Sequence, residues 1–165
     1  MQREMRRKNQ QLSQQESQNI LAQATSGVLA LSGTDDTPYA LPISFVHHAD
    51  SLYFHCAADG YKTDCIQKNP RASFCVIAQD QLLPEKFTTC FRSVIVFGRM
   101  EMVENPQEKQ SALHLLCDKY AAGQPGREEE IASAFSRVRI LALRIDAMTG
   151  KEAIELTKAR KTLSE

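Results

Sequence analysis

A strand pattern runs directly into a predicted helix start in the segment Ser51-Leu52-Tyr53-Phe54-His55-Cys56-Ala57-Ala58-Asp59-Gly60-Tyr61-Lys62. Leu52, Phe54 and Cys56 share one face of this strand, because successive side chains of a strand point to opposite faces. The small residues and glycine that follow let a backbone approach a ligand closely, free N–H groups at a helix start attract anions, and Lys62 adds a positive charge. The segment is therefore a candidate phosphate site, although Ala-Ala-Asp-Gly is also the composition of an ordinary turn.

Further short strands are predicted on both sides of this segment. Upstream, apolar and β-branched residues at 28–31 and 39–46 flank a turn cluster and predict a β-hairpin. Downstream, strands are expected at 73–78, 93–103 and 138–147, with Gly98 as a bulge or a point of close approach. The stretch 80–89 contains Pro84 and lacks periodicity, so we expect a loop there.

Helices are predicted between and outside these strands. Ser13 and Glu16 fit a capping box, which predicts a helix over 14–24. One or two helical turns are expected at 62–68, and a helix of about four turns begins at Pro106. The pattern predicts a mainly β fold, a six-stranded antiparallel β-barrel with peripheral helices. We divide the chain into a basic N-terminal arm (1–12), one domain (13–152) and a loosely held polar tail (153–165).

Composition excludes several classes of partner and site. Lysine plus arginine number 20, as do aspartate plus glutamate, so no global field favours nucleic acid or an anionic membrane. No apolar stretch approaches the ~20 residues of a membrane-spanning helix. The five cysteines include no Cys-x-x-Cys pair, and with no signal peptide pattern at the N-terminus they predict reduced thiols and a cytoplasmic location. His47 and His48 are adjacent on a strand and point to opposite faces, so no metal site is predicted.

Two other segments could border a ligand. Arg92-Ser93-Val94-Ile95-Val96-Phe97-Gly98-Arg99 is a β-branched run ending in glycine, which also fits a plain core strand. Pro42 lies inside a predicted strand, where it breaks the ladder and leaves neighbouring backbone groups free, although such a proline could merely mark a sheet edge. The sequence holds no Gly-x-Gly-x-x-Gly, Walker or Gly-x-Ser-x-Gly pattern, which argues against dinucleotide folds, P-loop enzymes and α/β-hydrolases.

Taken together, these segments carry a family resemblance over residues 5–155. It rests on Met5-Arg6-Arg7-Lys8, Pro38-Tyr39-Ala40-Leu41-Pro42-Ile43-Ser44-Phe45-Val46, Leu52-Tyr53-Phe54-His55-Cys56-Ala57 with Gly60 and Lys62, Arg92-Ser93-Val94-Ile95-Val96-Phe97-Gly98-Arg99, and Thr149-Gly150-Lys151. These stretches resemble the nitroimidazole-resistance (Nim) branch of the pyridoxamine 5'-phosphate oxidase-like superfamily. The resemblance implies a split β-barrel homodimer with FMN bound in clefts at the subunit interface.

The resemblance also implies roles for individual residues. Pro42, Ile43 and Ser44 would border the isoalloxazine ring, and His55, Cys56 and Ala57 would lie along the flavin. Gly60 and Lys62 would meet the phosphate, Ser93 and Val94 would hydrogen-bond near the ring, and Lys151 would reach the site. His55 is the candidate catalytic residue, orienting an acceptor or donating a proton. Cys56 departs from the family pattern, which has serine, and a thiol beside a flavin is a candidate for redox sensitivity.

The activity implied is reduction of a small acceptor, such as a nitro compound, by hydride from reduced FMN, with a small-molecule electron donor. Alternatives are a flavin-binding module without turnover, serving storage or redox sensing, a pyridoxamine 5'-phosphate oxidase, and a haem-binding relative. The oxidase is disfavoured because it needs an arginine-rich C-terminal segment, whereas this tail carries only Lys158, Arg160 and Lys161.

Overall fold

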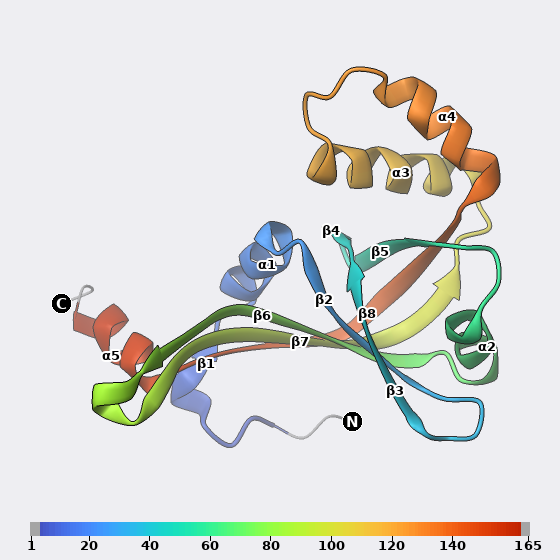
Figure 1. Cartoon of the computed structure of the whole chain (residues 1–165). Helices are drawn as coiled ribbons and strands as arrows, with labels where there is room; N and C mark the ends of the chain where they lie inside the picture. The colour runs from blue at the N-terminus through green and yellow to red at the C-terminus, as the bar shows by residue number, and fades with distance from the viewer. Residues whose placement is uncertain (1–3, 163–165) are drawn as a thin grey trace.

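One antiparallel sheet forms the centre of the computed structural model, which describes residues 4–162 (Figure 1). Seven strands follow one another in the order β3-β2-β6-β7-β8-β5-β4, and β1 pairs with β8 beside them, giving eight strands in the described range instead of the predicted six. The strands are β1 (Gln11–Leu12), β2 (Ser26–Ser32), β3 (Pro38–Ser44), β4 (Val46–His48), β5 (Ser51–Cys56), β6 (Arg71–Leu83), β7 (Thr88–Met102) and β8 (Arg139–Glu152).

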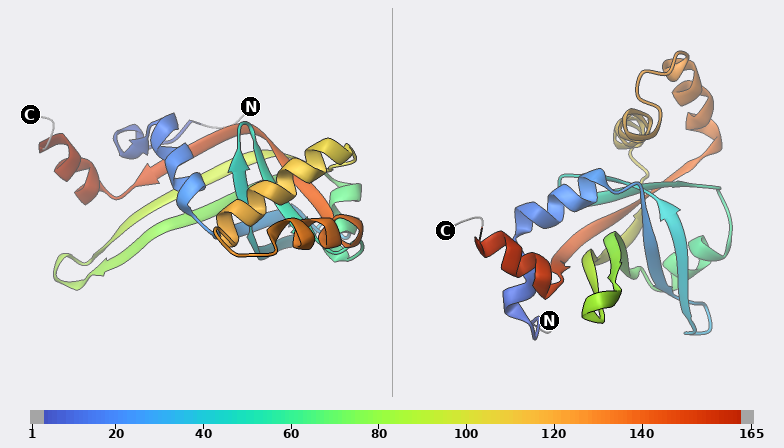
Figure 2. Two further views of the ribbon diagram at one scale, coloured as in Figure 1. Left: turned by 90° about the horizontal axis from the view of Figure 1, so that it is seen from above. Right: turned by 60° about the vertical axis from the view of Figure 1, so that its left-hand side comes forward.

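The helices lie around the sheet, and two groups of them mark its opposite ends. A helical pair, α3 and α4, covers one end over β4, β5 and the first half of β8, and α5 lies at the opposite end (Figures 1 and 2). The helices are α1 (Gln14–Gln23), α2 (Tyr61–Lys68), α3 (Pro106–Tyr120), α4 (Arg127–Arg137) and α5 (Ile154–Thr162), with 3-10 turns η1 (Lys8–Gln10) and η2 (Pro84–Lys86).

A hydrophobic cluster packs against each face of the sheet. The larger cluster lies inside the curved sheet, where the rings of Phe45, Phe54 and Phe74 contact one another with centroids as close as 4.7 Å. The smaller cluster lies on the other face, where Tyr53 and Ile140 pack beneath the helical pair. β5 therefore contributes alternate side chains to both clusters, as its strict alternation predicts.

Several local predictions are confirmed. The capping box forms as expected, since the Ser13 hydroxyl accepts the N–H of Glu16 and the Glu16 carboxylate accepts the N–H of Ser13. At Gly98 the β7–β8 register shifts, and a Cβ would lie 1.9 Å from the backbone oxygen of Arg144. Only glycine permits so close an approach of two backbones.

Other predictions are wrong. The expected loop at 80–89 is the outer part of a long β6–β7 hairpin that turns at η2 and projects beyond the sheet (Figure 1). Its pattern is weak because both faces of this hairpin arm are largely exposed, so no side of it needs to be apolar. Residues 154–162 of the tail form α5, and residues 11 and 12 of the supposed arm form β1. Arg127–Arg137, where no element was predicted, form α4.

Candidate functional site

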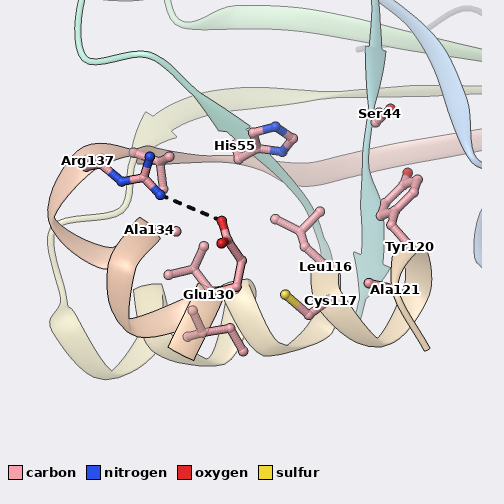
Figure 3. A pocket seen from close by; sticks show the side chains of 12 residues that line it. Ser44, His55, Leu116, Cys117, Tyr120, Ala121, Glu130, Ala134 and Arg137 are labelled. Carbon is pink, nitrogen blue, oxygen red and sulfur yellow. Dashed lines mark ion pairs between the residues drawn. The ribbon is translucent and has the colours of Figure 1, made fainter. Parts of the chain in front are cut away.

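A cavity of about 520 Å³ lies between the helical pair and the ends of β3 and β5 (Figure 3). The side chains of Leu113, Leu116 and Ile131 give it apolar walls, and an ion pair between Glu130 and Arg137, with N···O 3.7 Å, lies at its edge. The complete lining is Ser44, His55, Leu113, Leu116, Cys117, Tyr120, Ala121, Glu130, Ile131, Ala134, Arg137 and Val138.

Two of the predicted site residues meet at this cavity. Ser44 is the last residue of β3, His55 is the penultimate residue of β5, and both line the cavity wall. His55 faces the helical pair because it shares its side of β5 with Tyr53. Cys56 points the opposite way into the large cluster, where burial raises the pKa of its thiol against the influence of Lys62 and Arg139. A raised pKa disfavours the reactive thiolate that redox sensitivity requires.

Tyr120, at the end of α3, holds the break between β3 and β4 in place. The N–H of Phe45 donates to the Tyr120 hydroxyl at 2.8 Å, and that hydroxyl can donate to the backbone oxygen of Phe45 at 2.7 Å or to that of Thr25. The ammonium of Lys119 lies 4.3 Å from the centre of the Phe45 ring. Since Phe45 directly follows Ser44, these contacts fix the cavity wall that Ser44 forms.

The candidate phosphate segment follows directly after the end of β5, the strand that carries His55. Residues 57–60 are exposed, and α2 begins after Gly60, which has φ 147° and offers no side-chain cap to the first turn. Lys62 is half-buried in that turn, and both Lys62 and Arg139 lie near enough to Cys56 to influence the pKa of its thiol. Sequence reasoning missed Arg139, because only the pairing of β5 with β8 places it opposite Cys56.

The remaining predicted residues lie elsewhere in the sheet. Ser93 and Lys151 are paired neighbours on β7 and β8, half-exposed on the outer face of the sheet, and Pro42 is exposed on the same face of β3. Val94 is fully buried, and Ile43 packs against the large cluster, so both side chains point away from that face. Within one chain the predicted residues therefore form four groups: the cavity wall, the loop before α2, the outer face of the sheet and the large cluster. Their contacts with a cofactor remain predictions.

Metal-ligand clusters and membrane-spanning helices are both absent from residues 4–162. No three His, Cys, Asp or Glu side chains of this range come together as metal ligands. None of the helices in the same range combines the length and the apolar character needed to cross a membrane.

Comparison with known proteins gives consistent results. The chain is 29% identical over 150 residues to an uncharacterized protein of Rhizobium meliloti (strain 1021), a match that covers 86% of this chain and 93% of that protein. It is similar in structure to a protein assigned to 5-nitroimidazole antibiotic resistance from Bacteroides thetaiotaomicron VPI-5482, with a TM-score of 0.73, 24% identity and 86% of each chain covered. It is also similar to an FAD-binding protein from Mesorhizobium loti, with a TM-score of 0.64, 25% identity, and 87% and 96% of the two chains covered.

These similarities confirm the predicted fold class, a mainly β split barrel with peripheral helices. A family model described as pyridoxamine 5'-phosphate oxidase matches residues 13–152, which is most of the sequence. The chain belongs to the pyridoxamine 5'-phosphate oxidase family.

Proposed function

We propose that the protein binds FMN and acts as a flavin-dependent reductase of small acceptors, in the manner of a nitroreductase. One observation carries the proposal: the end of β5 puts His55 on a cavity wall and leads within seven residues to Lys62 in the first turn of α2. The cavity wall and the candidate phosphate-binding cation are thereby connected by one short loop. The similarity to an FAD-binding protein supports a flavin over an unrelated cofactor.

The residues present fit the phosphate of FMN. The start of α2 lacks a side-chain cap, so its free N–H groups can meet an anion, and Lys62 lies in the same turn. Arg139 adds a second positive charge near the loop, as its influence on Cys56 indicates. Two cations with free backbone donors suit a phosphate group that carries close to two negative charges.

The chemistry divides between the cofactor and the protein. A bound reduced flavin supplies hydride, and one hydride with one proton converts a nitro group to a nitroso group with release of water. In the proposal His55 orients the acceptor or delivers that proton, because it is exposed toward the cavity. Lys62 binds the phosphate and takes no part in the transfer.

In the same proposal a second copy of the chain covers the outer face of β2, β6 and β7, with FMN at the interface. This face exposes Val28, Ile77 and Ile95, whose accessible fractions are 40%, 68% and 38%. Ser93 and Lys151 border the same apolar area, so a dimer would bring these predicted residues beside the partner subunit. Such an exposed apolar area on a sheet is typical of an interface.

The experiment is to purify the protein, record its absorption spectrum, and identify any released cofactor as FMN or FAD by chromatography. NAD(P)H should bleach the flavin band anaerobically and an added nitro compound should restore it. A protein that holds flavin without turnover would support the alternative of a binding or redox-sensing module. A colourless protein that takes up neither FMN nor FAD refutes the proposal. A haem spectrum also refutes it and supports the alternative of a haem-binding relative.

A matched pair of variants tests the phosphate contact. Lys62→Gln should weaken FMN binding about tenfold, as expected for loss of one charged hydrogen bond, and leave riboflavin binding unchanged because riboflavin lacks the phosphate. Lys68→Gln, at the other end of α2, should leave both affinities unchanged, since Lys68 pairs with Asp36 and the backbone of Thr34. Equal effects of Lys62→Gln on FMN and riboflavin would contradict a phosphate role.

A further inference from the structure

We infer that the cavity under the helical pair binds the electron acceptor, and that it selects flat, uncharged aromatic molecules. This inference rests on the proposed flavin site beside the cavity, because Ser44 and His55 line the cavity and are also predicted to contact the flavin. It assigns the specificity of the reaction to α3 and α4, which lie outside every segment that carried the sequence resemblance.

The cavity is not explained by the packing of the two helices. Ile131 is the only residue of α4 that is fully buried, and Ala134, which faces the same space, is too small to fill it. A hollow of about 520 Å³ is within the range of small-molecule sites and leaves room for a one- or two-ring compound.

The lining sets the chemistry of the ligand. Leu113, Leu116 and Val138 offer apolar surface, and the Cys117 thiol is neutral because burial raises its pKa. The charges at the edge, Glu130 and Arg137, have opposite signs and pair with each other. A charged ligand would be attracted by one of them and repelled by the other, and would lose hydration against apolar walls. An uncharged aromatic molecule avoids both costs.

Two polar groups of the lining, Ser44 and His55, belong to the predicted flavin residues. His55 and Ser44 come from the sheet, whereas the helices contribute mostly apolar side chains (Figure 3). An aromatic acceptor would therefore lie with its ring against α3 and α4 and its reducible group toward His55. Tyr120 stabilises this arrangement because its hydroxyl binds the backbone next to Ser44.

Nitrobenzene and 4-nitrobenzoate form a matched pair of probes, since they differ mainly by a carboxylate. Calorimetric titration without NAD(P)H should show nitrobenzene binding at least about tenfold more tightly than 4-nitrobenzoate. Ala134→Phe fills the cavity and should weaken nitrobenzene binding at least about tenfold with flavin content unchanged. Ala132→Phe places the same ring on the exposed side of α4 and should change binding by less than about twofold.

Three results would overturn the inference. The first is that Ala134→Phe binds nitrobenzene as tightly as the unmodified protein, and the second is that the unmodified protein binds 4-nitrobenzoate at least as tightly as nitrobenzene. The third is loss of flavin in Ala134→Phe, because the cavity would then be part of the flavin site. If Ala134→Phe does not fold, alkylation of Cys117 in the unmodified protein decides, because its sulfur lines the cavity. Nitrobenzene should slow that alkylation, and absence of protection overturns the inference. A protein without flavin would refute the proposed function, yet these binding tests would still be decisive for the cavity.

Discussion

Replacing Tyr120 with phenylalanine tests the connection between α3 and the break after β3. The variant keeps the ring and removes only the hydroxyl, so the N–H of Phe45 loses its acceptor. Phe45 is fully buried, with an accessible fraction of 0%, and a buried donor left without a partner costs about 1–3 kcal/mol. For a domain of this size that loss corresponds to a decrease in Tm of about 2–12 °C.

Urea denaturation followed by circular dichroism measures this loss directly. The midpoint should fall with an unchanged m-value, since the denatured state is the same. The control is Tyr61→Phe, whose hydroxyl accepts the N–H of Thr34 at 3.3 Å in an exposed position, and it should cost less than about 0.5 kcal/mol. Burial raises the pKa of Tyr120, so its hydroxyl remains protonated at neutral pH and the bond is intact under the conditions of the assay.

A Tyr120→Phe variant as stable as the original protein would refute the reasoning, because it would mean that water or another group satisfies the Phe45 N–H. If stability falls as expected, flavin affinity should fall as well, since Tyr120 fixes the backbone beside Ser44.

Three other perturbations have definite expected outcomes. Gly98→Ala would place a Cβ 1.9 Å from the Arg144 backbone oxygen, and we expect little soluble protein on expression. Phe87→Asn should raise the free energy of unfolding by about 0.5–1 kcal/mol, which urea denaturation would show as a higher midpoint. Phe87 has φ 50° and is 99% exposed, and asparagine tolerates this conformation better. Hydrogen bonds from Ser13 lower the pKa of Glu16 to about 2, so its stabilisation is present above pH ~4.5 and lost as pH falls toward 2. In Glu16→Gln the loss of unfolding free energy between pH ~4.5 and ~2 should be smaller by about 1 kcal/mol, a value reduced for solvent screening. Urea titrations across this pH range measure the difference.

The sequence was informative where one face of an element is buried and the other is not. The alternation of β5 correctly placed Phe54 in the core and His55 outside it, and the Ser13 capping box correctly began α1. The α3 prediction succeeded for the same reason, since Pro106 starts the helix and an apolar stripe follows. In each case a local pattern reports a local environment.

The features that the sequence did not predict were missed for several reasons. The hairpin arm is exposed on both sides, so no periodicity distinguished it from a loop. In α4 an apolar stripe at helical spacing, Ile131, Ala134 and Phe135, packs against the smaller cluster, and sequence reasoning overlooked it. The cavity escaped prediction because it combines β3, β5, α3 and α4, and their proximity depends on tertiary packing. Arg139 escaped for a similar reason, since its relation to Cys56 is a matter of strand register.

The position of β8 has a consequence for synthesis of the chain on the ribosome. This strand pairs with β1, β5 and β7, so it alone connects β4 and β5 to the rest of the sheet. Ser51 pairs with Arg144, which is translated about 90 residues later. Until β8 has emerged, Tyr53 and the other side chains of β5 have no sheet neighbour on that side. β5 therefore stays unpaired on that side during most of translation, and unpaired apolar strands are prone to aggregate.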